Sequence, residues 1–346
     1  MLTTNMKGNS MDKIILAHGE GGKLTRELIE NEIYPSFKND ILKTLSDSAI
    51  LKNFGRVEIA FTTDSYIVSP IFFKGGDIGS LSISGTINDL AVSGAKPIAI
   101  SFSLIIEEGF EIEKLKKIIK SASNTAKKAN VLVVTGDTKV VPKGKGDEIF
   151  ITTSGIGIVE NGRKLSDDMI KEGDKILVSG DVGRHGATIA AFRHNLKGKN
   201  LSSDCAPLNK VIDLLFENGI KPKSLHDPTR GGVATLLNEV SRRAKVNIEI
   251  EEEKIPISKE VAGVCEILGL DPLYLPCEGR FVGFFRKSDA KKVISILKEV
   301  DICKGCSIIG EVKKGKNGIF PVTLKTRYGS IRPVDELTGL QLPRIC

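Results

Sequence analysis

Apolar runs that predict strands alternate along the chain with segments whose apolar residues recur at helical spacing. The segment 115–122 carries four apolar residues at the i, i+3, i+4, i+7 spacing of an amphipathic helix. A second helix is expected over residues 77–97, where Gly94 and Pro97 would end it. Around these helices, four apolar runs predict strands: "RVEIAFTTDSYIV" (56–68), "IAISFSLII" (98–106), "VLVVTGDTKVV" (131–141) and "IFITTSGIGIV" (149–159).

A second series of predicted elements follows "RKLSDDMIKEGDK" (163–175), which we interpret as a connector. The clearest helix of this series comes after "HDPTRGG" (226–232). The series also includes the segments "ILVSGDVG" (176–183), "GRFVGFF" (279–285) and "CSIIGEV" (306–312). From about Asp335 the periodicity ends. We therefore predict an α+β protein with an N-terminal segment (1–41), a first domain (42–160), a second, α/β domain (161–334) and a flexible tail (335–346).

The composition is that of a globular protein of the cytoplasm. Apolar residues make up 40% and charged residues 27% of the 346 positions. No apolar run approaches the roughly 18 residues that span a bilayer, and the first ten residues lack the apolar segment of a signal peptide. The net charge of +7 is spread along the chain, so we expect an anionic small molecule, and neither nucleic acid nor a membrane, as partner.

The six cysteines show no disulfide framework. Cys303 and Cys306 form a "CKGC" pair, which could indicate redox chemistry or half a metal site. No second close pair completes a zinc site, and we interpret both cysteines as structural or incidental. Cys346 is unusual because it is the last residue, where chain ends fray and exposed thiols are usually avoided. Eleven extended residues before the end could reach roughly 35 Å, which is enough to enter a cleft.

Four aspartates beside turns or small residues are candidate cation ligands: Asp47, Asp64, Asp89 and Asp137. One aspartate at a turn is most often a helix cap or an Asx turn. Four in one predicted domain favour a shared role, because Mg²⁺ prefers carboxylates together with phosphate oxygens.

Three glycine-rich segments could bind the phosphates through backbone amides, although each could also be a tight turn. They are "HGEGGK" (18–23), "SGDVGRHG" (179–186) and "DPTRGG" (227–232). None fits a P-loop or a dinucleotide fingerprint, so we expect a magnesium–nucleotide site of another kind.

Five stretches together resemble the HypE family of hydrogenase maturation proteins, in the PurM-like (aminoimidazole ribonucleotide synthetase) superfamily. The resemblance extends from about Met11 to Cys346. The aspartate and glycine stretches indicate the superfamily, and the terminal "PRIC" indicates HypE in particular. The stretches are "LAHGEGGKLTRELI" (16–29), "FTTDSYIVSPIFFKGGDIGSLSISGTINDLAVSGAKP" (61–97), "TGDTKVV" (135–141), "HDPTRGGVATLLNEV" (226–240) and "PRIC" (343–346).

The resemblance implies an ATP-dependent carbamoyl dehydratase that carries its substrate on its own C-terminal cysteine. In this family a carbamoyltransferase, HypF, loads a carbamoyl group onto the terminal sulfur. The protein then uses ATP to dehydrate this thiocarboxamide to an S-bound thiocyanate, and the cyanide passes to iron on the HypC–HypD complex for the NiFe hydrogenase active site. The resemblance also implies a PurM-like fold, a homodimer formed through the N-terminal sheets, and ATP with Mg²⁺ in a cleft between the N- and C-terminal domains.

Matching the family's motifs residue by residue assigns expected roles. The catalytic residues would be Cys346, which is also the modified residue, with Lys139 and Glu278. The metal ligands would be Asp47, Asp64, Asp89 and Asp137. The nucleotide would contact these aspartates and Gly21, Gly22, Lys23, Thr138, Asp227, Thr229, Arg230, Gly231 and Gly232. The chain departs from the family pattern at Cys277 and Arg280, where we expect an asparagine and a lysine.

Other interpretations of the sequence stay open. Without the resemblance, Lys139 would be a solvated surface lysine and Glu278 a charge at a strand edge. Selenophosphate synthetase would carry a reactive Cys or selenocysteine near the N-terminus, where "HGEGGK" has none, and neither it nor thiamine-monophosphate kinase has reason to end in cysteine. A non-catalytic scaffold that binds nucleotide and presents its tail would not need Lys139 and Glu278.

Overall fold

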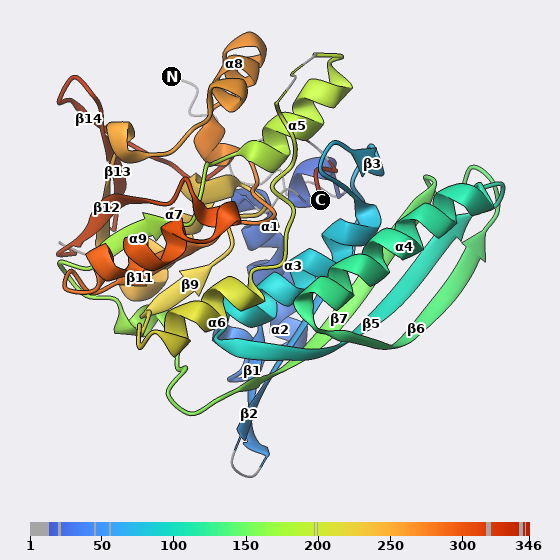
Figure 1. The fold of residues 1–346 in the computed structure, drawn as a ribbon, viewed down its shortest axis with the longest axis horizontal. Coiled ribbons are helices and arrows are strands. Elements are labelled where there is room, and N and C mark those ends of the chain that lie inside the picture. The colour runs from blue at the N-terminus through green and yellow to red at the C-terminus, as the bar shows by residue number, and fades with distance from the viewer. Residues whose placement is uncertain are drawn as a thin grey trace, which may run out of the picture.

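The computed structural model of this chain describes residues 14–19, 22–44, 46–54, 57–196, 198, 200–315, 320–338, 342 and 344–346. They form two large sheets with helices packed on them, one sheet from each half of the chain (Figure 1). Among these residues, no helix combines the length and the apolar character needed to cross a bilayer.

The first sheet has five strands in the order β1-β2-β7-β5-β6. Neighbouring strands are antiparallel except β5 and β6, which are parallel because helix α4 connects them. The elements are β1 (Ala49–Phe54), β2 (Val57–Tyr66), the hairpin β3 (Phe72–Phe73) and β4 (Gly76–Asp77), α3 (Ile78–Val92), β5 (Ala95–Glu107), α4 (Ile112–Ala129), β6 (Leu132–Val141) and β7 (Ile149–Val159). The predicted strands and helices of this half are confirmed, except that α3 ends at Val92, because β5 already begins at Ala95.

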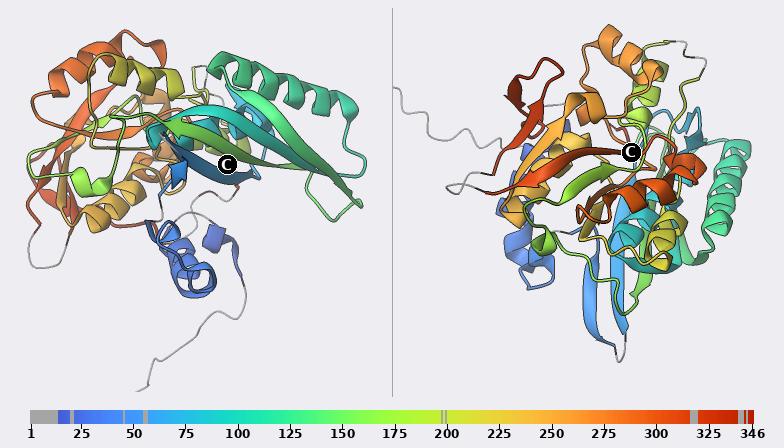
Figure 2. Two further views of the ribbon diagram at one scale, coloured as in Figure 1. Left: turned by 90° about the horizontal axis from the view of Figure 1, so that it is seen from below. Right: turned by 60° about the vertical axis from the view of Figure 1, so that its left-hand side comes forward.

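Helix α3 is the core of the first half. A capping box between Asp77 and Ser80 starts it, and most of its residues are buried. It packs against the sheet on one side and α4 on the other, and Figure 2 shows α4 on the outer side of this layer. The opposite face of the sheet leaves apolar residues such as Phe61 and Ile156 exposed.

The second sheet has seven strands in the order β14-β13-β10-β12-β8-β11-β9. All neighbours are antiparallel except β10 and β13. The strands are β8 (Lys175–Val178), β9 (Ser224–His226), β10 (Asn247–Glu251), β11 (Val282–Phe285), β12 (Ser307–Lys313), β13 (Val322–Lys325) and β14 (Ile331–Pro333). The helices are α5 (Arg184–Arg193), α6 (Asn209–Glu217), α7 (Gly232–Ala244), α8 (Lys259–Leu268) and α9 (Ala290–Lys298), with short turns η4 (Asp167–Met169), η5 (Glu252–Lys254), η6 (Pro272–Tyr274) and η7 (Asp301–Cys303).

Contacts between the two halves position the later site. Asn88 of α3 is fully buried, and its Nδ2 donates to the carbonyl oxygens of Ala206 at 3.2 Å and Glu278 at 3.3 Å. Its Oδ1 accepts a hydrogen bond from Leu208 N at 2.8 Å. Because buried amides need such partners, Asn88 ties the Glu278 loop to the helix that carries Asp89.

The N-terminal segment packs on the start of the tail. It contains the short helices η1 (Leu16–Gly19), α1 (Lys23–Leu28), η2 (Ile29–Ile33), α2 (Tyr34–Phe37) and η3 (Leu42–Thr44). Glu336 accepts hydrogen bonds from Arg26 and Arg242, which joins the N-terminal segment to α7. Leu342, Ile345 and Cys346 are buried among residues of both halves, so the C-terminus ends inside the molecule (Figure 1).

Candidate functional site

An acidic cavity of about 290 Å³ lies where the two halves meet. Asp64 reaches it from β2, Asp89 from α3, Asp47 from the turn before β1, and Asp227 from the loop after β9. The structure thus brings together three of the four predicted metal ligands and several predicted nucleotide contacts, namely Asp227, Thr229, Arg230 and Gly232.

These carboxylates are crowded and largely removed from water. Burial raises the pKa of Asp64. Burial, followed by the nearby charge of Asp227, raises the pKa of Asp89 well above its usual range. Burial, followed by Asp47, raises the pKa of Asp227 to about 8. A bound cation would reverse these shifts, because it stabilises every ionised carboxylate near it.

The donor set fits Mg²⁺ that shares its ligands with phosphate. Within the described ranges, no three His, Cys, Asp or Glu side chains form a group that could hold a metal ion by itself. Mg²⁺ is usually bound by one or two carboxylates, with phosphate oxygens and water completing its shell. The cavity supplies carboxylates from the first half and the N-terminus of the 13-residue helix α7 from the second.

Glycine is required where α7 begins. Gly231 and Gly232 have φ values of +74° and +61°, in the left-handed region that other residues avoid. A Cβ at Gly232 would lie 2.4 Å from the carbonyl oxygen of Leu273. The two glycines therefore let the loop turn tightly into α7 while Thr229 and Arg230 line the cavity.

The terminal thiol lies against Arg230 of this cavity. Cys346 is 8% exposed, and its Sγ accepts a hydrogen bond from Arg230 Nε at 3.2 Å. Arg230 Nη2 lies 3.7 Å from Asp64 Oδ1, so one guanidinium connects the thiol with the carboxylates. Burial raises the pKa of Cys346 to about 12, although Arg230 favours the thiolate.

Glu278 is a buried carboxylic acid between η6 and β11. It is 2% exposed, and its Oε1 has no hydrogen-bond partner among the described residues. Burial, followed by the charges of Asp227 and Asp204, raises its pKa well above the usual range. A buried carboxyl group with an unpaired oxygen is unfavourable unless a ligand completes it, which is typical of a functional acid or base.

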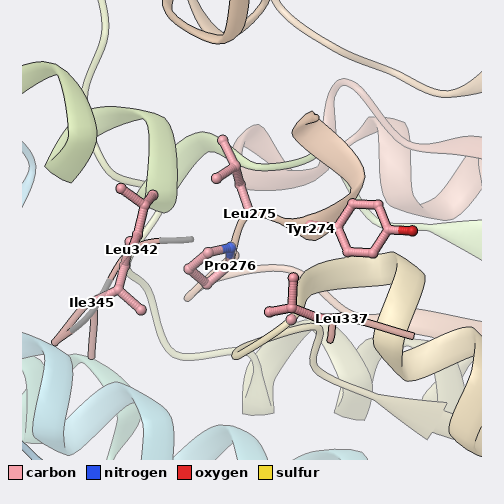
Figure 3. A pocket seen from close by; sticks show the side chains of 7 residues that line it. Tyr274, Leu275, Pro276, Leu337, Leu342 and Ile345 are labelled. Atoms are coloured by element: carbon pink, nitrogen blue, oxygen red, sulfur yellow. The ribbon is translucent and has the colours of Figure 1, made fainter. Parts of the chain in front are cut away.

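The last residues of the predicted flexible tail are docked on the protein in this structure. Ile67 N donates to Cys346 O and Ser69 N to Arg344 O, each at 3.1 Å, so residues 344–346 lie along 67–69. Figure 3 shows Leu342 and Ile345 beside Leu275 and Pro276, around a cavity of only about 10 Å³. The surface that binds these residues comes from segments that are distant in sequence, and the flexibility of the tail stays a prediction.

The described residues of "HGEGGK", which are 18, 19, 22 and 23, are not part of the cavity lining. A Cβ at Gly22 would lie 2.3 Å from the carbonyl oxygen of Leu337, and Lys23 N donates to that oxygen at 3.0 Å. Gly21 lies outside the described residues. Gly22 and Lys23 therefore contact the start of the tail, while Gly19 O accepts a hydrogen bond from Arg230 Nη1 at 2.9 Å.

Three predicted residues lie away from the cavity, on the edge strand β6. Asp137, Thr138 and Lys139 are exposed, as is every residue from Leu132 to Val140. Lys139 Nζ pairs with Asp137 Oδ2 at 2.7 Å and lowers the pKa of that carboxyl group. Within one chain, the structure does not bring these residues to the other predicted site residues.

His226 is a site residue that the sequence analysis missed. Its Nδ1 lies 2.7 Å from Asp47 Oδ2 and its Nε2 lies 2.8 Å from Asp167 Oδ1. Burial lowers its pKa, but the two carboxylates outweigh burial and raise the pKa to about 10. His226 is thus a buried cation that orients Asp47. The position of His226 directly before "DPTRGG" could have indicated a site residue. Its partner Asp167 could not have been found in this way, because it lies in the segment interpreted as a connector.

Further cavity residues carried no sequence signal of their own. Thr62, Thr63 and Glu239 line the cavity, and Thr62 Oγ1 donates to Asp89 Oδ2 at 2.8 Å. Such residues are common in strands and helices, so only their position in the folded structure identifies them as candidate site residues.

The two departures from the family pattern have packing partners. Cys277 is buried, and its Sγ accepts a hydrogen bond from Gly183 N at 3.1 Å. Arg280 Nη2 pairs with Asp181 Oδ1 at 2.8 Å, so the segment "SGDVGRHG" supports the Glu278 loop. Cys303 and Cys306 are buried free thiols, and burial raises the pKa of Cys303 to about 12.

Comparison with known proteins finds relatives along nearly the whole chain. Residues 45–159 match the family "AIR synthase related protein, N-terminal domain", and residues 171–322 match "AIR synthase related protein, C-terminal domain". A putative hydrogenase expression/formation protein of Methanocaldococcus jannaschii is 46% identical over 341 residues, which is 96% of this chain and 100% of the relative. Carbamoyl dehydratase HypE of Cupriavidus necator is 40% identical over 343 residues, which is 99% of this chain and 96% of the relative.

Solved structures give the same result. A HypE–HypF complex matches with a TM-score of 0.83 and 44% identity, over 90% of this chain and 99% of the matched chain. A hydrogenase maturation protein HypE in complex with ATP matches with a TM-score of 0.80 and 39% identity, over 96% of this chain and 100% of the other. The predicted two-domain PurM-like fold is confirmed.

Proposed function

Because the chain belongs to the HypE family of carbamoyl dehydratases, we propose that it uses ATP to dehydrate a carbamoyl group carried on Cys346 to a thiocyanate, for hydrogenase maturation. The observation that carries this proposal is the place of the terminal thiol. Cys346 Sγ contacts Arg230, which also lines the acidic cavity, and the charge of Glu278 acts on the same thiol. A carbamoyl group on this sulfur would therefore lie close to Arg230 and within the electrostatic influence of Glu278.

ATP and Mg²⁺ fit the acidic cavity. Asp47, Asp64 and Asp89 would hold the ion, and Thr229 with the N-terminus of α7 would bind phosphate. When bound, Mg²⁺ neutralises the triphosphate and makes the γ-phosphoryl group a better acceptor. The protein's own contribution is to orient Asp47 through His226 and to align the carbamoyl oxygen with the phosphoryl group.

Dehydration requires that the carbamoyl oxygen become a leaving group. The oxygen attacks the γ-phosphorus of ATP, ADP departs, and the nitrogen loses its first proton, giving an O-phosphorylated isoimide. The nitrogen then loses its second proton as the C–O bond breaks, and phosphate and S-bound thiocyanate result. Arg230, which already donates to the sulfur, stabilises negative charge that develops on the adjacent oxygen and phosphate.

Glu278 is the proposed base for the nitrogen protons. Burial makes its carboxylate a strong base once it is ionised, and Arg230 favours the ionised form. Its unpaired Oε1 is a free acceptor in the part of the chain that the structure describes. Asn88 holds the loop of Glu278 against α3, so the base keeps its place relative to Asp89.

A homodimer would explain the place of Asp137, Thr138 and Lys139. Strand β6 is a sheet edge with exposed apolar residues, including Leu132 at 68% and Val140 at 66% exposure. Exposed apolar edges are usually covered by another chain. We propose that β6 packs on a second copy, and that Lys139 and Asp137 then act in the partner's cavity as charge-stabilising and metal-binding residues.

The proposed partners follow from the same cycle. HypF would load Cys346, and the HypC–HypD complex would receive the cyanide, so the tail must leave the site at both steps. A cytoplasmic location fits the six free thiols.

ATP turnover by carbamoylated protein tests the proposal. We expect ADP release in proportion to the carbamoyl groups loaded, and none from Cys346→Ala after the same treatment. ADP release that does not depend on Cys346 would contradict the proposal and would favour a kinase-like or scaffold function.

A further inference from the structure

We infer that His185 is a positioning residue that holds the carrier end of the chain in the site through the carbonyl group of Ile345. This inference rests on the proposed role of Cys346 as carrier. His185 Nε2 lies 2.7 Å from Ile345 O, the carbonyl of the peptide that leads directly into Cys346. Neither composition nor spacing singled out this histidine.

The hydrogen bonds around His185 define the proton on Nε2. A carbonyl oxygen only accepts, so Nε2 must carry the proton that it donates to Ile345 O. Nδ1 lies 2.8 Å from Ser203 Oγ, and because burial favours the neutral ring, the hydroxyl donates to Nδ1. Ser203 Oγ in turn accepts a hydrogen bond from Cys205 N at 3.0 Å. This relay fixes one neutral tautomer and aims Nε2 at the tail.

The surroundings of His185 are rigid. The side chain is fully buried on α5, and the ring of Phe73 packs edge-on against it, with centroids 5.2 Å apart. Burial lowers the pKa of His185, which agrees with the neutral form. A donor held by packing and by a second hydrogen bond places its acceptor more accurately than a surface side chain can.

His185 is one of four groups that hold three successive carbonyl groups of the tail. Ser69 N and Arg193 Nη2 donate to Arg344 O, at 3.1 and 2.7 Å, and Ile67 N donates to Cys346 O at 3.1 Å. All of these bonds are made to the backbone. The end of the chain can therefore be held in the same way whether its sulfur carries a proton, a carbamoyl group or a cyano group.

The other cysteines provide an internal standard for the test. Wild-type protein and His185→Leu, His185→Gln and His194→Leu are alkylated without ATP, and each cysteine is followed by peptide mass spectrometry. His194→Leu is the matched control, because His194 is exposed at the end of the same helix. In His185→Leu we expect Cys346 to react roughly tenfold faster, the effect of losing one buried hydrogen bond, while Cys277 and Cys303 react as in wild type.

Single-turnover dehydration and loading by HypF complete the test. His185→Leu should slow dehydration at least about threefold without slowing carbamoylation, because only dehydration needs the docked tail. Glutamine also presents an N–H group, so His185→Gln should stay within about threefold of wild type in both assays. If His185→Leu does not fold, Ser203→Ala, which removes the donor to Nδ1, is used with a smaller expected increase in Cys346 alkylation.

The possible outcomes separate the inference from the proposed function. Unchanged alkylation of Cys346, equal acceleration at all three cysteines, or dehydration at the wild-type rate would overturn the role of His185. If wild-type protein shows no dehydration at all, the proposed function fails. The alkylation rates still decide whether His185 holds the chain end.

Discussion

Replacing Glu278 by glutamine should separate substrate binding from proton transfer. Glutamine keeps the size of the side chain but cannot accept a proton from the carbamoyl nitrogen. Loss of a general base costs about 10²–10⁴-fold in rate, which corresponds to roughly 2.7–5.5 kcal/mol of transition-state stabilisation. ATP binding and loading of Cys346 should be nearly unchanged, because Glu278 is proposed to act only as phosphate leaves.

The folded protein should tolerate this change. Burial raises the pKa of Glu278, so its contribution to stability is present below the unfolded-state pKa and is lost as pH rises through the folded-state pKa. Glutamine has no such titration. The Glu278→Gln variant should therefore match wild type at low pH and equal or exceed its melting temperature at pH 8.

Rapid-quench experiments with intact-mass detection provide the assay. Each variant is loaded by HypF, mixed with Mg–ATP and sampled over time. Wild type should lose water from the carbamoylated form, whereas Glu278→Gln should retain the carbamoyl group. Glu266→Gln, on the exposed side of α8, is the matched control. Thiocyanate formation by Glu278→Gln at the wild-type rate would refute the assignment of the base.

The remaining predictions concern the metal, pH and the second copy. Asp64→Asn should weaken Mg–ATP binding about tenfold or more in calorimetric titration and so remove about 1.4 kcal/mol of ATP-dependent stabilisation in thermal unfolding. The control Asp301→Asn, at an exposed position, should leave both unchanged, and unchanged titrations for Asp64→Asn would exclude Asp64 as a ligand. Because the pKa of Asp227 is about 8 without a cation, Mg²⁺ must displace its proton, so stabilisation by Mg–ATP should grow from pH 6 to 9. Asp227→Asn should flatten this rise, and an equal slope in both proteins would exclude Asp227 from the Mg–ATP site. The double variant Leu132→Lys, Val140→Lys should sediment as a monomer and should no longer dehydrate the carbamoyl group, whereas Ile112→Lys, at an exposed position on α4, should behave as wild type. A dimer in the double variant would exclude β6 as the interface.

The sequence predicted the elements whose burial pattern is local. Strands β2 and β7 and helix α4 show their periodicity within a few residues. The structure has the two strands close to the predicted bounds, and α4 contains the periodic segment 115–122. Asp64, Asp89 and the "DPTRGG" loop were predicted for one site, and the structure places them around one cavity.

What the sequence could not predict depends on distant contacts. The apolar run of β6 has the composition of a core strand, but the chain leaves it exposed at a sheet edge, and composition does not reveal whether another copy covers it. The burial of Cys346 depends on Ile67, His185 and Arg230, which are far from it in sequence. The close approach of Gly22 to Leu337 likewise joins segments that are distant in sequence.

The central claim is that Cys346 carries the group that this protein dehydrates, and mapping the modification tests it most directly. Protein is incubated with carbamoyl phosphate, ATP and HypF, and the C-terminal peptide is analysed by mass spectrometry over time. We predict that Cys346 first gains a carbamoyl group and then, only with ATP, loses water to become a thiocyanate, while the five other cysteines stay unmodified. Modification of Cys303 or Cys306 instead, or a carbamoyl group that persists on Cys346 in the presence of Mg–ATP, would contradict the account.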